Sequence, residues 1–255
     1  MPSSPEETQA AVAAAIKAGK LLRNAFVNGS EVKSAAGRDI KLDADVKAEE
    51  AILAVLRERT DCPVLSEEAG PDKGLSHDER HWVIDPLDGT FNFSRGIPLC
   101  CVSIGLMEHG HPVLGVIYDF MSDTLYKGGK GLPALANEAP LRSSRTRDIS
   151  QAAVCTGFPL RADYGTESLL GVAGLATRFK KVRMLGSAAT SLSMVARGSM
   201  DAYVETGISL WDVAAGIAIV EAAGGRVMFR PVGDHAQLHV VATNGELRPE
   251  AIDQA

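Results

Sequence analysis

The chain has 255 residues, 45% of them hydrophobic and 23% charged, which is the composition of a globular protein and excludes disordered and fibrous classes. Its 26 basic and 32 acidic residues give a formal net charge of −6 without a long basic block, so nucleic acid is not expected as a partner. No apolar run approaches the roughly 18 residues of a membrane helix, and the first residues lack the pattern of a signal peptide. These features predict a soluble, cytoplasmic protein that does not associate with membranes.

The first half of the chain predicts two helices followed by strands. Apolar residues at helical spacing predict helices over 6–28 and 45–59. Two apolar runs joined by Glu108-His-Gly-His predict a β-hairpin. The expected strands are 63–66, 81–85, 99–107, 113–120 and 124–127.

The second half alternates between strands and helices. The expected strands are 152–156, 181–185, 200–205, 226–229 and 237–243, and the expected helices are 166–179, 187–197 and 211–223. Meander-like strands first and alternating elements later predict an α+β protein of layered sheets and helices. A polar stretch at 142–150 is a soft boundary, which divides one domain of residues 1–255 into halves 1–145 and 146–255.

The most informative stretch is WVIDPLDGTFNF at residues 82–93. An apolar strand is expected to end at Asp85, because Pro86 has no N–H group for the ladder. Asp85 and Asp88 then stand three residues apart in a turn, where both carboxylates can bind one cation with the Leu87 carbonyl between them. An isolated D-x-x-D is usually an ordinary turn that caps a helix, so the metal interpretation depends on further acids.

Other residues favour a site for metal and phosphate. Gly89 allows a close approach of the backbone, and Thr90 is placed where a helix can begin, so that backbone N–H groups can hold a phosphate. Glu67 ends a preceding strand, and Asp212 opens an apolar helix, where a carboxylate is favourable and can still bind a cation. Asp45 precedes the second helix and by itself is an ordinary helix-start acid.

Several motifs resemble the signatures of the inositol monophosphatase family, in the family's order and over about residues 10–245. They are SEE at 66–68, WVIDPLDGTFNF at 82–93, GSAA at 186–189, GSMDAYVE at 198–205, WDVAAG at 211–216 and EAAGG at 221–225. The resemblance implies a layered α-β-α-β-α sandwich and a magnesium-dependent phosphomonoesterase that forms a homodimer. The implied substrate is myo-inositol monophosphate or a similar small polyol or sugar phosphate.

The resemblance also implies a set of metal ligands. Glu67, Asp85 and the Leu87 carbonyl would hold a first ion, Asp85, Asp88 and Asp212 a second, and Glu67 would contact a third. Crowded carboxylates raise one another's pKa, so cations are needed to keep them ionised. Oxygen ligands without Cys or His favour Mg²⁺, with Mn²⁺ as a substitute, over zinc.

Catalytic and substrate-binding residues follow from the same correspondence. Asp45 and Thr90 match the pair that orients and deprotonates the attacking water, and Glu67 completes the catalytic set. Glu205 matches a position that accepts hydrogen bonds from substrate hydroxyls. The expected substrate contacts are Gly89, Thr90, Gly186, Ser187, Ala188 and Glu205.

The chain departs from the family pattern at three positions. Ser66 stands where the family often has glycine, and little effect is expected. Leu42 stands where a threonine often precedes the water-orienting acid, which removes one hydroxyl near Asp45. Lys33 lies one residue from the usual spacing of an upstream basic residue and is left out of the catalytic set.

The resemblance leaves the substrate open. The basic cluster at 178–183 is expected to be a solvated face, with a second-phosphate site as its alternative. The same chemistry on fructose 1,6-bisphosphate, histidinol phosphate or a nucleotide 3′-phosphate is the alternative enzyme. A non-catalytic, metal-dependent interaction or regulatory module is the alternative of another class. Lithium sensitivity is not decided by the sequence.

Overall fold

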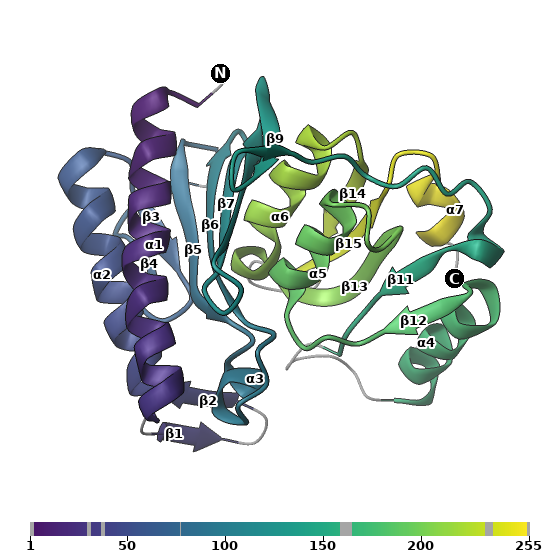
Figure 1. Ribbon diagram of the computed structural model, residues 1–255, viewed down its shortest axis with the longest axis horizontal. Coiled ribbons are helices and arrows are strands. Elements are labelled where there is room, and N and C mark those ends of the chain that lie inside the picture. Colours follow the sequence, from purple (N-terminus) through teal and green to yellow (C-terminus); the bar gives the residue numbers. More distant parts are fainter. Residues whose placement is uncertain are drawn as a thin grey trace.

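The protein is built of alternating layers of helices and sheets. The computed structural model describes residues 3–29, 32–36, 39–76, 78–158, 165–232 and 237–253. Two outer helices, a sheet of eight strands, two inner helices, a sheet of five strands and a last pair of helices follow one another across the molecule (Figure 1). This arrangement confirms the predicted α+β class and the α-β-α-β-α layers.

The described helices are α1 (Pro5–Asn28), α2 (Asp43–Arg59), α3 (Thr90–Ser94), α4 (Thr166–Arg178), α5 (Ala188–Ala196), α6 (Leu210–Ala222) and α7 (Pro249–Asp253), with a 3₁₀ turn η1 (Ile149–Gln151). Among them, none combines the length and the hydrophobicity that crossing a membrane requires.

The large sheet has the strand order β10-β9-β8-β7-β6-β5-β3-β4 and the smaller one β12-β11-β13-β15-β14, while β1 and β2 pair only with each other. The strands of the large sheet and the β1–β2 pair are β1 (Val32–Ala36), β2 (Asp39–Leu42), β3 (Val64–Ser66), β4 (Gly70–Pro71), β5 (His81–Asp88), β6 (Cys101–Glu108), β7 (His111–Asp119), β8 (Thr124–Gly129), β9 (Leu132–Ala136) and β10 (Ala139–Pro140). Those of the smaller sheet are β11 (Ala153–Cys155), β12 (Lys181–Arg183), β13 (Ala202–Ser209), β14 (Arg226–Pro231) and β15 (Gln237–Thr243).

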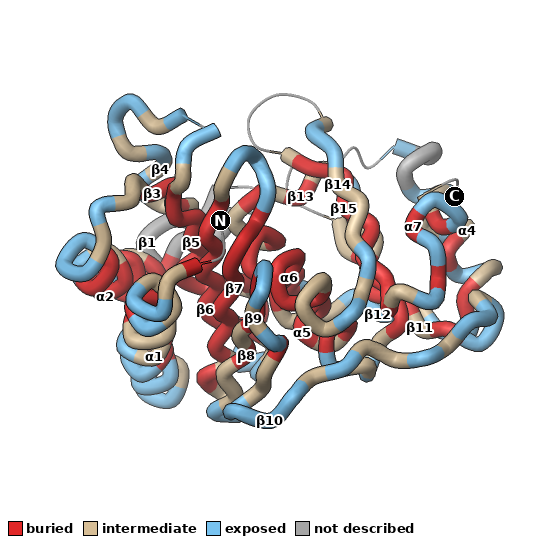
Figure 2. Tube along the Cα trace, turned by 90° about the horizontal axis from the view of Figure 1, so that it is seen from above, coloured by how far each residue is buried: buried red, intermediate tan, exposed pale blue. Residues whose placement is uncertain are grey.

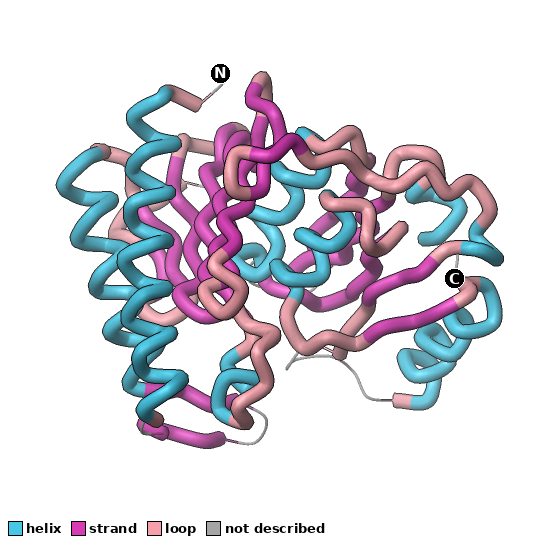
Figure 3. Tube along the Cα trace, viewed as in Figure 1, coloured by secondary structure: helices cyan, strands magenta, loops and turns pink. Residues whose placement is uncertain are grey.

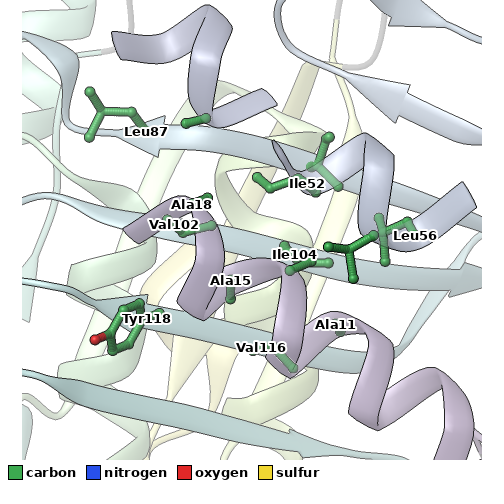
Figure 4. Close-up of a cluster of buried hydrophobic side chains, with 14 of the residues drawn as sticks. Ala11, Ala15, Ala18, Ile52, Leu56, Leu87, Val102, Ile104, Val116 and Tyr118 are labelled. Carbon is green, nitrogen blue, oxygen red and sulfur yellow. The ribbon is translucent and has the colours of Figure 1, made fainter. Parts of the chain in front are cut away.

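Helices α1 and α2 cover the outer face of the large sheet. The buried face of α1 consists of small residues, among them Ala11, Ala15 and Ala18, so this helix lies close to the strands (Figure 4). In the same cluster, Ile52 of α2 packs with Ile104 of β6. Burial of such side chains contributes about 25 cal/mol per Å² of apolar surface. The layer therefore fixes α2, which carries Asp45, against the sheet.

Helices α5 and α6 fill the space between the two sheets. The tube in Figure 2 shows α6 buried through its middle, from Val213 to Val220, with β5 to β7 on one side and β13 to β15 on the other. A side chain at Gly115 of β7 would place its Cβ 2.0 Å from the Ala215 carbonyl oxygen, so only glycine permits this approach of helix and strand. The contact holds the first turn of α6, with Asp212, beside the large sheet.

The strand that carries the WVID motif is longer than predicted. The expected end at Asp85 was wrong: β5 reaches Asp88, although its register against β6 shifts between these two residues. The irregularity accommodates Pro86, and the ladder resumes beyond it. All residues of β5 are buried, so both aspartates stand on a central, rigid strand.

The predicted elements otherwise occur in the expected order, and strand 237–243 has the predicted bounds. The expected helix start at Thr90 is confirmed by α3. The prediction did not include the short pairs β1–β2 and β9–β10, nor β4 and α7. Figure 3 shows the loop that leads from the large sheet to the smaller one and contains the expected soft boundary at 142–150. Strands of two to five residues carry too little periodicity to stand out from turns.

Candidate functional site

A cluster of three aspartates, two of them buried and Asp212 half-buried, lies where β5 and α6 approach each other. Asp85, Asp88 and Asp212 each place a carboxylate oxygen within 4.8 Å of the others. Two of these residues come from the large sheet, and the third comes from a helix more than 120 positions further along the chain. Tertiary folding thus brings together three of the five residues predicted to hold metal.

The turn after Asp85 is arranged by hydrogen bonds within the motif. The Leu87 N–H donates to Asp85 Oδ1 at 2.9 Å, and the Thr90 hydroxyl donates to the Leu87 carbonyl at 3.0 Å. Gly89 has φ +92°, and a Cβ there would lie 2.8 Å from the carbonyl oxygen of Leu99. Glycine is therefore required for both the backbone conformation and the packing at the start of α3.

Asp88 is held by the first turn of α5. Its Oδ2 accepts hydrogen bonds from the Ser187 hydroxyl and the Ala189 N–H, each at 2.6 Å, and its Oδ1 accepts from the Ala188 N–H at 3.3 Å. A carboxylate is favourable there because the N–H groups of a first helical turn lack partners within the helix. Ser187 and Ala188, which were expected to contact substrate, thus also anchor an acid of the cluster.

Asp212 belongs to the N-terminal capping box of α6. Its Oδ2 accepts a hydrogen bond from the Ser209 N–H at 3.2 Å. One carboxylate oxygen of Asp212 also belongs to the cluster, and the helix dipole favours the negative charge. The prediction that Asp212 opens an apolar helix is confirmed.

Glu67 and Asp45 extend the acidic cluster toward α2. The charge of Glu67 acts on Asp85, and the charge of Asp45 acts on Glu67. Asp45 is buried, and its Oδ2 accepts the Leu42 N–H at 2.6 Å. The backbone of Leu42 thus provides a helix-start contact although its side chain has no hydroxyl.

Crowding and burial change the proton affinity of these acids. Burial most of all raises the pKa of Glu67 to about 7 and that of Asp88 to about 6, although the bonds from α5 act against the rise at Asp88. Burial, followed by the charge of Glu67, raises the pKa of both Asp85 and Asp212 well above the ordinary range. A bound cation would reverse these shifts, because it favours the ionised carboxylates.

Glu205 lies on the far side of the cluster, on β13. It is buried, accepts a hydrogen bond from the Tyr203 hydroxyl at 3.0 Å, and is close enough to Asp88 and Asp212 to interact with both charges. Burial raises the pKa of Glu205 to about 7. A Cβ at position 157 would lie 2.7 Å from its Oε2, so Gly157 provides the space that this carboxylate occupies.

Two of the four basic residues at 178–183 contact the outer layer of the smaller sheet. The Arg178 guanidinium donates to backbone carbonyls of α7, and Lys180 Nζ lies 2.9 Å from the side-chain oxygen of Gln151 in η1. Both contacts lie on the outer layer of the smaller sheet, which favours the solvated-face interpretation of the cluster at 178–183. Lys33 belongs to β1, and its side chain lies outside the described residues.

Two buried polar residues near the site received no role from the sequence. The Asn92 amide donates to the Leu99 carbonyl at 2.8 Å and to the Leu185 carbonyl at 2.7 Å, and so ties α3 to the segment with Gly186. The position of Asn92 within the DGTFNF motif could have indicated that it matters for the site. Glu49 lies one helical turn after Asp45 on a buried face of α2, and this spacing was the only hint of its importance.

The fold and the site define a layered α+β protein with a buried carboxylate cluster that can bind metal. The profile of the inositol monophosphatase family matches residues 4–254, and the chain belongs to this family. The chain is 40% identical to an inositol-1-monophosphatase of Mesorhizobium japonicum, over 85% of this chain and 82% of that protein. It is 41% identical to a Nus factor SuhB of Xylella fastidiosa, over 74% of this chain and 68% of that protein.

The comparison with solved structures supports the same assignment. The extragenic suppressor protein suhB of Bartonella henselae superposes with a TM-score of 0.85 at 32% identity, over 97% of this chain and 96% of that one. The fold expected from the motifs is thereby confirmed. Membership in this family supports phosphatase chemistry that depends on a metal.

Proposed function

We propose that the protein is a Mg²⁺-dependent phosphomonoester hydrolase that acts on myo-inositol monophosphate or a similar small polyol or sugar phosphate. The observation that carries the proposal is the convergence of Asp85, Asp88 and Asp212, whose carboxylate oxygens lie within 4.8 Å of one another. Family membership supports the reaction class.

The donor set fits hard divalent cations. Asp85 and Asp88 are buried, and Glu67 and Asp212 are half-buried. All four acids offer only oxygen donors and have raised pKa values, so a bound cation would offset their mutual repulsion. The residues that would hold two or three ions of Mg²⁺, or Mn²⁺ in its place, are Glu67, Asp85, Leu87 through its carbonyl, Asp88 and Asp212. When bound, the ions supply charge neutralisation and a lowered pKa of water.

Other residues of the chain would position the reactants. In this proposal Asp45 and Thr90 orient the attacking water, and Asp45 accepts its proton. Gly89 and Thr90 offer first-turn N–H groups, which lack partners within a helix, to the phosphate. Phosphoryl transfer depends mostly on positioning and on neutralisation of charge. Hydrolysis then needs no covalent intermediate on the protein.

Substrate choice is assigned to the side of the site formed by the second half. Glu205 would accept hydrogen bonds from substrate hydroxyls, opposite a wall formed by Gly186, Ser187 and Ala188. The contacts of Arg178 and Lys180 with the outer layer favour a monophosphate over fructose 1,6-bisphosphate. Histidinol phosphate and nucleotide 3′-phosphates are the remaining alternatives. A homodimer and a cytoplasmic location, with neither nucleic acid nor membrane as a partner, stay predictions.

A regulatory role is the second candidate function. The observation that favours it is that relatives such as the Xylella fastidiosa protein are named Nus factor SuhB. Such a role requires no turnover, whereas the acids described above are those expected of a working phosphatase. The two candidates differ in whether phosphate is released.

The test is phosphate release from a panel of inositol 1-phosphate, fructose 1,6-bisphosphate, histidinol phosphate and 3′-phosphoadenosine 5′-phosphate, with Mg²⁺ and with chelator. We expect Mg²⁺-dependent release, with inositol 1-phosphate preferred. A different preferred compound would replace the proposed substrate. No release by folded protein that binds Mg²⁺ would favour the regulatory role.

A further inference from the structure

Helix α2 directs two buried acids, one turn apart, toward the acidic segment that contains Glu67. Asp45 acts on Glu67 through its charge. Glu49 is 6% exposed, and its Oε1 accepts two hydrogen bonds, one from the Ser66 hydroxyl and one from the Ala69 N–H at 2.9 Å. Glu49 therefore contacts the residues on both sides of Glu67 without being part of the aspartate cluster.

These contacts, with one backbone bond, fix the short turn at 66–69. Ser66 ends β3, which pairs with β5 in parallel, and the Glu67 N–H donates to the Ile84 carbonyl at 3.2 Å. The backbone of Glu67 is thus tied to β5 directly before Asp85. Glu49 holds the turn from its other side, through the Ser66 side chain and the Ala69 backbone.

The turn at 66–69 needs this support because the negative charge of Glu67 is repelled by the acids around it. Glu67 lies beside Asp85, and the negative charges of Asp45, Asp88 and Glu68 act on it as well. Repulsion in a buried site is strong because the local dielectric constant is low. Burying the Glu49 carboxylate is also costly, unless hydrogen bonds to the group offset its loss of water. The buried hydrogen bond between Glu49 and Ser66 therefore favours a role in holding the backbone around Glu67 in place.

We propose that Glu49 and Ser66 are positioning residues that hold the turn at 66–69, so that the Glu67 carboxylate stays where a divalent cation can bind. This inference rests on the proposed function, because it assigns Glu67 to the metal. Ser66 stands where the family often has glycine, and this difference was expected to have little effect. In this inference the Ser66 hydroxyl helps to hold the turn through its hydrogen bond to Glu49. Neither residue contacts the substrate or the reacting atoms.

The test measures Mg²⁺ binding directly, by isothermal titration calorimetry, in addition to activity. Ser66→Ala removes one bond to Glu49, and Glu49→Asp retracts the acceptor by one methylene group. Both should raise the dissociation constant for Mg²⁺ about tenfold, as changes behind metal ligands commonly do. Glu49→Gln keeps an acceptor oxygen and should rescue binding to within about threefold of the native value. At saturating Mg²⁺, KM for the phosphate ester should be unchanged.

Two control variants separate positioning from a general effect on the fold. Ser193→Ala removes another buried hydroxyl, which donates to the Ala189 carbonyl at 2.9 Å, and Glu50→Gln alters the exposed neighbour of Glu49. Both should bind Mg²⁺ with native affinity. If Ser66→Ala and Glu49→Asp lower only the melting temperature and bind Mg²⁺ natively, the inference is overturned. A Glu49→Gln variant as weak as Glu49→Asp would also overturn it, since charge and not acceptor position would then matter.

Failure of this inference is distinguishable from failure of the proposed function. If native protein binds Mg²⁺ but releases no phosphate, and Ser66→Ala weakens binding, positioning stands and the phosphatase proposal fails. If native protein is active and the two variants match it in Mg²⁺ affinity and rate, only the positioning inference fails. If native protein binds no Mg²⁺, both fail.

Discussion

The two sides of the acidic cluster are built from different kinds of structure. On one side, Asp85 and Asp88 stand on a fully buried strand in the middle of a sheet. On the other side, Asp212 and the N–H groups of Ala188 and Ala189 come from the first turns of two helices. The strand concentrates negative charge where water is excluded, while the helix ends provide partial positive charge. Negative charge is therefore gathered on the buried strand, and the helix ends opposite it balance this charge only in part.

Replacing Asp88 would change both sides at once and should have the largest effect. Asp88→Asn keeps an acceptor for α5 but removes a charge from the cluster. Phosphate release with Mg²⁺ should fall by at least about 10³-fold, because stabilisation by metal accounts for several kcal/mol. Circular dichroism should show an intact fold.

The melting temperature provides a second check of the same variant. Without divalent cations it should equal or exceed the native value, since repulsion is relieved, and added Mg²⁺ should raise it less than in native protein. Asp61→Asn, an exposed acid, is the control and should leave both quantities unchanged. Activity of Asp88→Asn close to the native level would contradict the metal assignment.

A substitution of Glu205 on β13 tests whether the second half of the chain determines the affinity for substrate rather than the affinity for metal. Glu205→Gln should raise KM for a polyol phosphate about tenfold, the value of a hydrogen bond to a charged acceptor. The rate at saturating substrate and the Mg²⁺ dependence should change little. Steady-state kinetics at saturating Mg²⁺ measure KM and the limiting rate, and a titration of Mg²⁺ at saturating substrate measures the Mg²⁺ dependence. An effect confined to the Mg²⁺ dependence would place Glu205 on the metal side instead.

The stability of the folded protein should depend on pH, with contributions from the acidic cluster and from Glu205 that Mg²⁺ can distinguish. The pKa values of about 7 for Glu67 and Glu205 and about 6 for Asp88 exceed ordinary values, so the folded protein binds more protons than the unfolded chain between about pH 4.5 and 7. With chelator, the melting temperature should therefore fall as the pH rises through this range.

Magnesium should remove the part of this slope that comes from the cluster. Protons and cations compete for Glu67 and Asp88, so Mg²⁺ should stabilise the protein more at about pH 8 than at about pH 5. Glu205 is not a proposed ligand, and the slope that persists with Mg²⁺ should disappear in Glu205→Gln. A slope that is the same with and without Mg²⁺ would argue against cation binding by these acids.

The smallest effect is expected from the helix cap that joins the two sides. Ser187→Ala removes a hydrogen bond to Asp88 and the side-chain cap of α5, which should cost about 1 kcal/mol of unfolding free energy. Activity should fall no more than about tenfold, because two backbone N–H groups still hold Asp88. Denaturant unfolding measures the loss, with Ser193→Ala as the comparison for a buried hydroxyl of α5 that does not bond Asp88. A loss of activity as large as that of Asp88→Asn would show that the hydroxyl does more than hold this acid.

Much of the candidate site was predictable because its residues occur in compact motifs. Asp85, Leu87 and Asp88 lie within four positions, and together with Glu67 and Asp212 in their own motifs they indicate a site of oxygen ligands. Asn92 was visible within the same motif but had no assigned role, since its partners lie at Leu99 and Leu185. Glu49 could not be identified from the sequence, because an acid in a helix is usually exposed and its partners follow 17 to 20 positions later.

Hydrophobic periodicity was enough to predict the order of the long helices and strands, and the motifs were enough to predict a site of oxygen ligands. Tertiary structure alone decided that β5 continues past Pro86, that α5 caps Asp88, and that Glu49 reaches the turn around Glu67. The physical reason is the range of the interactions. Periodicity and turn chemistry act between neighbours in the chain, whereas burial, close packing of α6 against Gly115, and the crowding of like charges depend on residues that only folding brings together.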